Sequence, residues 1–575
     1  MRTRTHFHGW PLVALTLGAS LALGASCNRH PAPPRPAPEA TPPRPAAAAP
    51  TLRLYYLVDL DGYLEPCGCQ SRPLGGIDRI AQVLERDRAT HPHRIVVAAG
   101  NLFFDTPRLD PRMVWQERQK AERLTQILGG LGLAAYAPGP ADFALGADAW
   151  RSLSGALPAA ALAGNAGMPG SVVREVGGVR VGVVGVSDFV TPDADAGPAG
   201  APAASDPVAA ARTAVAAARA QGAQVVVVLA SVPRRVARAV AAVEGVDFVI
   251  AARHEGPTTP APERVAGAYL LTAPNQGKAL GVVDLYLDGT AAWRDISEAS
   301  RTAEQSRLDG RIRELQARLT AWRADPTIDP GAVRTQAARL EALERERTTV
   351  AGPDTAASTG RRFAAQGIEV DATVPRNERV QSEIARYFRA VNERNRVEYA
   401  DLRPPTPAPG QPRYVGNEAC RDCHEEAFPV WERTSHARAY RTLEDSSKNF
   451  NLSCVGCHVT GYRQPGGSEV VQNVVVGEPR LQNVQCEVCH GPASAHIEAR
   501  GAAARRATIR RTVDGNFCAT QCHTPEHSDH FDFATYLPRI LGPGHGMPLP
   551  DDADDAGVTA APTPAPTPAP APAHP

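Results

Sequence analysis

The hydrophobic pattern of residues 51 to 295 alternates between strand-like and helix-like segments. Short apolar runs in "TLRLYYLVDL", "RIVVAAG", "AQVVVVLAS" and "DFVIAAR" predict buried strands. Between them, apolar residues recur at helical spacing in "GIDRIAQVLERDR" and "VWQERQKAERLTQILGGL". "SVVREVGGVRVGVVGV" predicts a hairpin with Gly177 and Gly178 at its turn. The pattern therefore predicts an α/β domain of layered sheets with helices outside.

Residues 296 to 402 follow a different, helical pattern. Apolar side chains recur at intervals of four and three residues, as in a coiled-coil seam. The pattern continues after the break "ADPTIDPGA". The two halves of this seam are Leu308, Ile312, Leu315, Leu319 and Trp322, then Val333, Ala337, Leu340 and Leu343. We predict a helical hairpin that acts as a spacer, followed by a connecting helix in "ERVQSEIARYFRAVNERN".

Proline-rich tracts mark the boundaries of the remaining regions. They cover residues 28–50, a tether; 403–412, a linker; and 551–575, a tail without a core. Residues 413–550 then form a C-terminal domain.

The first 27 residues have the pattern of an export signal. A charged start precedes "PLVALTLGASLAL", which is too short for a membrane span and has the length of a signal-peptide core. "GASC" then ends at Cys27 and resembles a bacterial lipobox, although the favoured leucine stands one position early. We predict a lipoprotein anchored to a membrane through Cys27, in the periplasm or at the cell surface of a bacterium. Ordinary cleavage without a lipid is the alternative.

The charges of the chain balance. It holds 61 Lys and Arg residues against 61 Asp and Glu residues, so the formal net charge is zero. Proteins that bind nucleic acid usually carry a basic surplus. The balance therefore argues against nucleic acid as a partner.

The C-terminal domain contains three C-x-x-C-H motifs and one near-match. These are "CRDCH", "CVGCH", "CEVCH" and, with one extra residue, "CATQCH". C-x-x-C-H is typical of c-type haem attachment, in which both thiols bind the porphyrin and the histidine binds iron. Zinc is the alternative, because pairs of cysteines also build tetrahedral zinc sites. Zinc does not require a histidine directly after the second cysteine, so four such placements favour four haems c.

Twelve residues follow from this interpretation. The attachment cysteines are Cys420, Cys423, Cys454, Cys457, Cys486, Cys489, Cys518 and Cys522, and the proximal iron ligands are His424, His458, His490 and His523.

This domain resembles the tetrahaem cytochrome c554 family. The phrases that carry the resemblance are "YVGNEACRDCHEEAFPVWERTSHARAY", "CVGCHVTGY", "NVQCEVCHGPASAH" and "CHTPEHSDHFDFATYLPRI". The resemblance implies a mainly helical, loop-rich shell around stacked haems, with His436 and His496 as distal ligands of haems attached elsewhere in the chain. A third distal ligand is expected near the end, where His545 stands and where His527 and His530 compete. It also implies that the second haem in sequence keeps an open iron face.

The order of landmarks in residues 51–295 resembles the metallophosphatase domain of bacterial 5′-nucleotidases. The phrases are "DLDGYLEPCGC", "VVAAGNLFFD", "LGLAAYAPGPADFALG" and "VDFVIAARHEG". Such enzymes hold two metal ions with Asp and His ligands. Here only Asp59 and His254 keep the expected chemistry, while Asn101 replaces the bridging aspartate. We therefore predict a degenerate site that holds no divalent metal and hydrolyses no nucleotide.

Two cysteines remain after haem and lipid are counted, Cys67 and Cys69 in "EPCGCQ". Cys-Gly-Cys can close a strained disulfide, and strained exposed disulfides are the more reducible ones. A redox pair or a metal-binding loop is one interpretation. A structural disulfide or two buried thiols is the other.

Together these features predict an exported multihaem c-type cytochrome that transfers electrons. We expect its partners to be redox proteins, among them other cytochromes. The alternatives are an oxidoreductase that acts at an open-faced haem on a small nitrogen or oxygen compound, and a metal-dependent nucleotide phosphohydrolase with a cytochrome attached.

Overall fold

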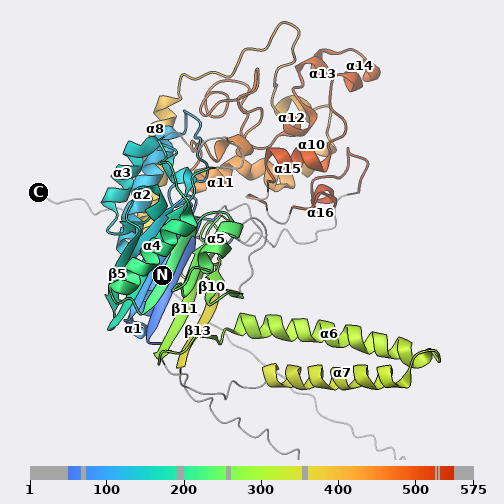
Figure 1. The fold of residues 1–575 in the computed structure, drawn as a ribbon. Coiled ribbons are helices and arrows are strands. Elements are labelled where there is room, and N and C mark those ends of the chain that lie inside the picture. Colours follow the sequence, from blue (N-terminus) through green and yellow to red (C-terminus); the bar gives the residue numbers. More distant parts are fainter. Residues whose placement is uncertain are drawn as a thin grey trace, which may run out of the picture. The chain divides into compact units, whose positions relative to one another are not determined.

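The computed structural model describes residues 49–66, 73–190, 200–253, 261–351, 360–524, 527–528 and 531–548 (Figure 1). The fold described below is that of the unit formed by residues 50–575. The predictions for Cys27, for the pair Cys67 and Cys69, for His254 and for His530 lie outside the described residues.

The first sheet has seven strands in the order β12-β13-β11-β1-β2-β3-β4. Its strands are β1 (Leu52–Val58), β2 (Arg94–Gly100), β3 (Leu133–Pro138), β4 (Ala160–Ala161), β11 (Ala279–Asp288), β12 (Arg294–Asp295) and β13 (Gly360–Glu369). β1 pairs in parallel with β2 and antiparallel with β11.

The second sheet has six strands in the order β5-β6-β7-β8-β10-β9. They are β5 (Ser171–Val176), β6 (Val179–Ser187), β7 (Val225–Ser231), β8 (Phe248–Ala251), β9 (Glu263–Val265) and β10 (Ala268–Leu271). The predicted hairpin joins β5 to β6, and both turn glycines have positive φ, as a tight two-residue turn requires.

Helices cover the outer faces of the two sheets, and the predicted α/β layering is confirmed. One apolar core lies between the sheets and joins residues such as Leu54 and Val97 to Val183 and Val227. On the outer face of the first sheet pack α1 (Ile77–Thr90), α2 (Val114–Leu131), α3 (Gly146–Ala156) and α8 (Glu378–Glu398). The second sheet is covered by α4 (Pro207–Ala220) and α5 (Arg234–Ala241).

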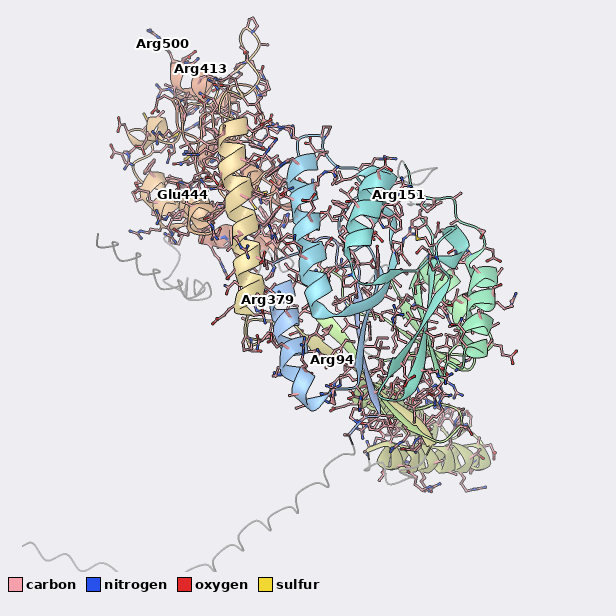
Figure 2. All side chains as sticks on the ribbon, turned by 90° about the vertical axis from the view of Figure 1, so that its left-hand side faces the viewer. Arg94, Arg151, Arg379, Arg413, Glu444 and Arg500 are labelled. Atoms are coloured by element: carbon pink, nitrogen blue, oxygen red, sulfur yellow. The ribbon has the colours of Figure 1, made fainter. Side chains whose placement is uncertain are left out.

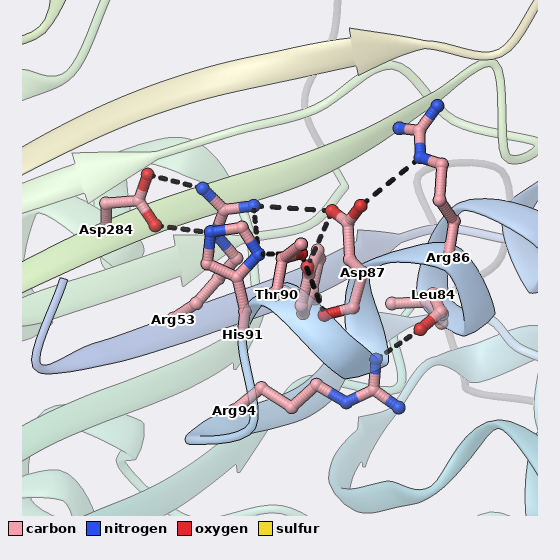
Figure 3. Close-up of polar contacts among 9 residues, drawn as sticks. Arg53, Leu84, Arg86, Asp87, Thr90, His91, Arg94 and Asp284 are labelled. Atoms are coloured by element: carbon pink, nitrogen blue, oxygen red, sulfur yellow. Dashed lines mark hydrogen bonds and ion pairs between the residues drawn. The ribbon is translucent and has the colours of Figure 1, made fainter. Parts of the chain in front are cut away.

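A buried arginine ties β1 to its neighbours (Figure 3). Arg53 donates two hydrogen bonds to the Asp284 carboxylate of β11, at 2.6 and 2.7 Å, and a third to Asp87 of α1 at 3.3 Å. A buried charge is costly unless it is paired and hydrogen-bonded, and here both carboxylates satisfy it. The cluster fixes the position of α1 against the sheet.

The predicted helical hairpin is present, but the α/β fold continues beyond it. α6 (Glu298–Ala324) and α7 (Pro330–Ala351) bury the predicted seam, including Leu308, Leu315 and Leu343. The chain then returns as β13, which pairs with β11 along its whole length, and as α8, which lies beside α1 and α2 (Figure 2). The hairpin is therefore an insertion in the α/β domain, and the predicted end of that domain at residue 295 is too early.

The C-terminal region consists of short helices joined by loops, as predicted. Its α-helices are α9 (Glu418–Arg421), α10 (Ala427–Arg433), α11 (Ala439–Asp445), α12 (Cys486–His490), α13 (Ser494–Glu498), α14 (Ala502–Ala507), α15 (Gly515–Gln521) and α16 (Phe533–Tyr536). The apolar clusters there are small, such as that of Tyr440, Val455, Val459 and Val474. Within the described part of the chain, no helix combines the length and the apolar character that a membrane span requires.

Candidate haem sites and the residual phosphatase site

The motif cysteines lie in or beside short helical turns. Cys420 is in α9, and the backbone amide of His424 donates to the Cys420 carbonyl at 3.0 Å. The third motif, Cys486 to His490, forms α12 by itself. A helical turn brings both cysteines of a motif to one side, so that they can bind one porphyrin edge. Of the eight motif cysteines, seven are half-buried and Cys423 is exposed.

The fourth motif accommodates its extra residue by widening the turn. The amide of His523 donates to the Cys518 carbonyl at 3.0 Å, although His523 is five positions after Cys518, whereas His424 is four positions after Cys420. Such a wider hydrogen-bonded turn is the local geometry of a π-bulge. The contact between histidine and first cysteine is therefore the same as in the first motif.

Three pairs of histidines face each other across similar distances. The ring centroids of His424 and His496 are 6.2 Å apart, with planes inclined by 26°. Those of His436 and His523 are 6.3 Å apart, and those of His490 and His545 are 6.2 Å apart. Each pair joins one predicted proximal ligand to one predicted distal ligand.

The spacing of these pairs fits a metal ion between the two rings. With a metal–nitrogen bond of about 2.0 Å on each side, two imidazoles on opposite faces of one ion have centroids about 6 Å apart. The three observed separations agree with that value. The residues present therefore fit iron held by two histidines.

Hydrogen bonds leave the other ring nitrogen available for the metal. His458 Nδ1 bonds the Ala439 carbonyl at 2.6 Å, His490 Nδ1 the Arg510 carbonyl at 2.7 Å and His496 Nδ1 the Arg505 carbonyl at 2.9 Å. A carbonyl oxygen can only accept, so Nδ1 carries the hydrogen and Nε2 keeps its lone pair. Metal-binding histidines almost always have such an outer partner, which fixes the tautomer and the ring orientation.

Burial favours the neutral form of four of the six paired imidazoles. Burial, together with the nearby His523, lowers the pKa of His436 to about 4. Burial also lowers the pKa of His424, His523 and His545. Only the neutral imidazole binds a metal, so this environment favours ligation at neutral pH.

The four motifs approach one another in two pairs. Contact with the Cys486 thiol is the first cause of the raised pKa of Cys420, and contact with the Cys457 thiol is the first cause of that of Cys522. Cys457 Sγ also lies 3.7 Å from the Gln521 carbonyl. The first motif is thus next to the third, and the second next to the fourth.

Sequence reasoning did not find the acceptors of the histidine Nδ1 atoms. Arg505 and Arg510 belong to the basic stretch of residues 500–511, whose backbone carbonyls receive these bonds. A backbone carbonyl is present at every residue, so no sequence signal could have identified these two.

In the α/β domain, the described residues at the predicted phosphatase-like site are joined by hydrogen bonds. Asp59 follows β1 and accepts from the amides of Asn101 at 3.2 Å and Arg253 at 2.8 Å. Asn101 Nδ2 donates to Asp61 at 3.3 Å, and its Oδ1 accepts from the Ala141 amide at 3.0 Å. Both the Nδ2 and the Oδ1 atom of the Asn101 side chain are therefore hydrogen-bonded to other groups of the protein.

The acids of this network are buried close together. Burial, reinforced by the charge of Asp59, raises the pKa of Asp61 to about 8. Burial likewise raises the pKa of Asp142 to about 7. Among the residues that the structure describes, no group of three or more His, Cys, Asp or Glu side chains is arranged to hold a metal ion.

Comparisons with known proteins agree with the motifs of the C-terminal region. Residues 419–491 match the family model of cytochrome c554 and c-prime. Cytochrome c-554 of Nitrosomonas europaea is 33% identical over 94 residues, which cover 14% of this chain and 38% of that protein. The C-terminal region is therefore similar to the cytochrome c554 family, and the chain spans well under half the length of this curated relative.

Solved structures similar to this chain include a sulfate thiohydrolase, a 5′-nucleotidase precursor and a calcineurin-like phosphoesterase. The sulfate thiohydrolase SoxB of Thermus thermophilus has a TM-score of 0.40 at 15% identity, covering 60% of this chain and 61% of that one. A 5′-nucleotidase precursor, also from Thermus thermophilus, has a TM-score of 0.39 at 14% identity, covering 73% and 84%. The calcineurin-like phosphoesterase YfkN of Bacillus subtilis has a TM-score of 0.40 at 16% identity, covering 60% and 98%.

Proposed function

We propose that this chain is an exported tetrahaem c-type cytochrome that transfers electrons between protein partners. Its haems are bound at Cys420 and Cys423, Cys454 and Cys457, Cys486 and Cys489, and Cys518 and Cys522. The α/β domain carries this cytochrome and does not hydrolyse phosphate esters.

The observation that carries the proposal is the set of three histidine pairs at 6.2 to 6.3 Å. In each pair, one member directly follows a cysteine motif and the other comes from a distant segment. Imidazole is a good iron ligand, and bound haem supplies a one-electron couple between ferric and ferrous iron.

The pairs also favour electron transfer over chemistry on a substrate. Where two imidazoles flank one iron, both axial positions are filled, so a small molecule has no coordination site there. The Nδ1 hydrogen bonds of His490 and His496 would orient these rings toward a bound iron. This arrangement suits a carrier at these positions.

Two features of the α/β domain support the absence of phosphatase activity. The amide of Asn101 lacks the charge that bridges two cations, and its hydrogen bonds to Asp61 and Ala141 already occupy it. Pro140 and Ala141, which stand at positions where a phosphatase would carry metal ligands, have no coordinating side chain.

The proposal includes a location and partners. c-Type haem sites, the signal-like start and Cys27 together favour an exported lipoprotein, tethered to a membrane by residues 28–50. Its partners would be other redox proteins, including cytochromes. The balanced charge of the chain gives no reason to expect nucleic acid.

A potentiometric titration of the purified protein tests the function. The protein should be made with c-haem maturation, and its spectrum followed from fully oxidised to fully reduced. We expect c-type spectra with a low-spin contribution from the three sites with paired histidines, and several resolved one-electron steps. A spectrum without the c-type bands, or a protein that binds zinc and no haem, would contradict the proposal.

A further inference from the structure

The α/β domain is hydrogen-bonded to the segment that precedes the second haem motif. Gln116 of α2 is 2% exposed. Its Nε2 donates to Asn451 Oδ1 at 3.1 Å and to Ser453 Oγ at 3.2 Å, and its Oε1 accepts from the Leu452 amide at 3.1 Å. A glutamine amide has two donors and one acceptor oxygen with two lone pairs. Three of its four bonds therefore reach residues 451–453.

Helix α8 adds a second set of bonds to the same segment. Asn395, 1% exposed, donates to the Phe450 carbonyl at 2.9 Å and to Gln116 Oε1 at 3.3 Å. Asn392 donates to Asn449 Oδ1 at 2.9 Å and accepts from the Phe450 amide at 2.8 Å. Two helices of the α/β domain thus present three amide side chains to five consecutive residues of the cytochrome region.

The bonds continue from this segment into the haem motif. The Asn451 carbonyl accepts from the amides of Cys454 at 3.0 Å and Val455 at 2.9 Å. The same residue accepts through Oδ1 from the Ser453 amide at 2.9 Å. Asn451 therefore links Gln116 to the backbone turn that carries the first attachment cysteine.

Ion pairs flank the segment on both sides. Lys448 pairs with Glu65 at 2.7 Å, and Arg112 pairs with Glu469 at 2.8 Å. Tyr399 at the end of α8 donates to the Arg112 carbonyl at 3.1 Å. The buried amides at the centre are enclosed by these contacts, and buried polar networks with all partners present hold one conformation.

We propose that Gln116, Asn392 and Asn395 are positioning residues for the haem attached at Cys454 and Cys457. The α/β domain thereby supports the second haem. Its helices α2 and α8 set the orientation and surroundings of that haem. This inference rests on the proposed function, since it requires a haem at the second motif.

The proposal gives the α/β domain a role that does not need phosphatase chemistry. A haem's reduction potential responds to outer hydrogen bonds and to burial around it. Because amide side chains hold the loop of residues 449–453, they fix both the hydrogen bonds and the burial around the haem attached next to it. The alternative is that the amides only hold the α/β domain and the cytochrome region together. Their loss would then shift the reduction potentials of all four haems alike.

The test uses the full four-haem protein with Gln116→Leu. The matched control is Gln126→Leu, an exposed glutamine on the same helix. A protein with both Cys454→Ala and Cys457→Ala lacks the second haem, so the titration step that it loses identifies that haem. We expect Gln116→Leu to shift this one step and its spectral component, and to leave the other three as in Gln126→Leu.

Two results would overturn the proposal. One is a Gln116→Leu titration that matches the control, and the other is an equal shift of all four steps. If Gln116→Leu does not accumulate, Ser453→Ala removes a single bond of the same network and is judged by the same two results. Intact mass distinguishes a failure of this inference from a failure of the proposed function. A parent protein without haem at the second motif contradicts the proposed function itself.

Discussion

His496 is the residue whose replacement reports most directly on one iron. It faces His424 at 6.2 Å, so His496→Ala should remove one axial ligand from the haem of the first motif. We expect that haem alone to change from low-spin to high-spin and to bind carbon monoxide. Electron paramagnetic resonance and the carbon monoxide difference spectrum measure the two effects.

The matched control for this variant is His527→Ala. His527 competes with His545 for the last distal position by sequence alone, but it is not a member of the three pairs described above. It should leave all spectra as in the parent. High-spin iron in His527→Ala together with unchanged spectra in His496→Ala would refute the assignment.

Asp61 makes the stability of the α/β domain depend on pH. Its pKa is about 8 in the folded protein, because of burial and the nearby Asp59, against about 3.9 for an unfolded aspartate. Between these values the folded state keeps a proton that the unfolded state has lost. The free energy of unfolding therefore falls as pH rises from about 4 to about 8, by at most about 1.4 kcal/mol per pH unit from this group.

Asp61→Asn should reduce this fall in the free energy of unfolding. Part of the fall should remain, because the pKa of Asp142 is also raised. Calorimetric unfolding at pH 5 and pH 8 measures the change. Asp148→Asn, whose parent side chain is 94% exposed, is the control and should behave as the parent. Equal pH dependence in parent and Asp61→Asn would show that the carboxyl titrates normally.

Single residues divide into those that sequence can identify and those that it cannot. The predicted attachment cysteines and proximal histidines are adjacent in sequence, because a c-type haem binds both thiols through its vinyl groups and the neighbouring histidine through its iron, so their pattern is visible. The partner of each distal histidine depends on tertiary structure. His436 lies between the first and second motifs, yet its ring faces His523 of the fourth.

At the scale of elements, α15 provides the sharpest test of the fourth haem. The widened turn joins the His523 amide to the Cys518 carbonyl, so the extra residue does not separate histidine from cysteine. Cys518→Ala should lower the amount of covalently bound haem by one. Deletion of the exposed Thr520, which restores the regular C-x-x-C-H spacing, should retain all four haems. Intact mass measures both, and a Cys518→Ala protein with no loss would exclude attachment there.

Elements with continuous apolar runs were predictable, whereas β13 was not. The strands β1, β2, β7 and β8 are buried along their length, so their apolar runs identified them. The β13 sequence "GRRFAAQGIE" alternates charged, small and glycine residues and contains few β-formers. It becomes a strand because it pairs with β11 over ten positions and buries Phe363 and Ala365.

At the scale of the whole molecule, the chain combines a two-sheet α/β domain with a C-terminal region that is similar to the cytochrome c554 family. The network of Asp59, Asn101 and Asp61 is internally hydrogen-bonded, and we expect no phosphate release from AMP with manganese or zinc. A colorimetric phosphate assay on purified protein measures this. The control is Asp59→Ala, and turnover in the parent that disappears in this variant would establish a working phosphatase.

The number of haems decides the central claim. The sequence supplies four cysteine motifs, and the structure brings three histidine pairs to the separation that an iron ion between them requires. Intact mass of the mature protein, made with c-haem maturation, is the most direct measurement. The account predicts a mass that exceeds the processed polypeptide by four haems. A mass equal to the bare polypeptide, or one increased only by zinc, would contradict it.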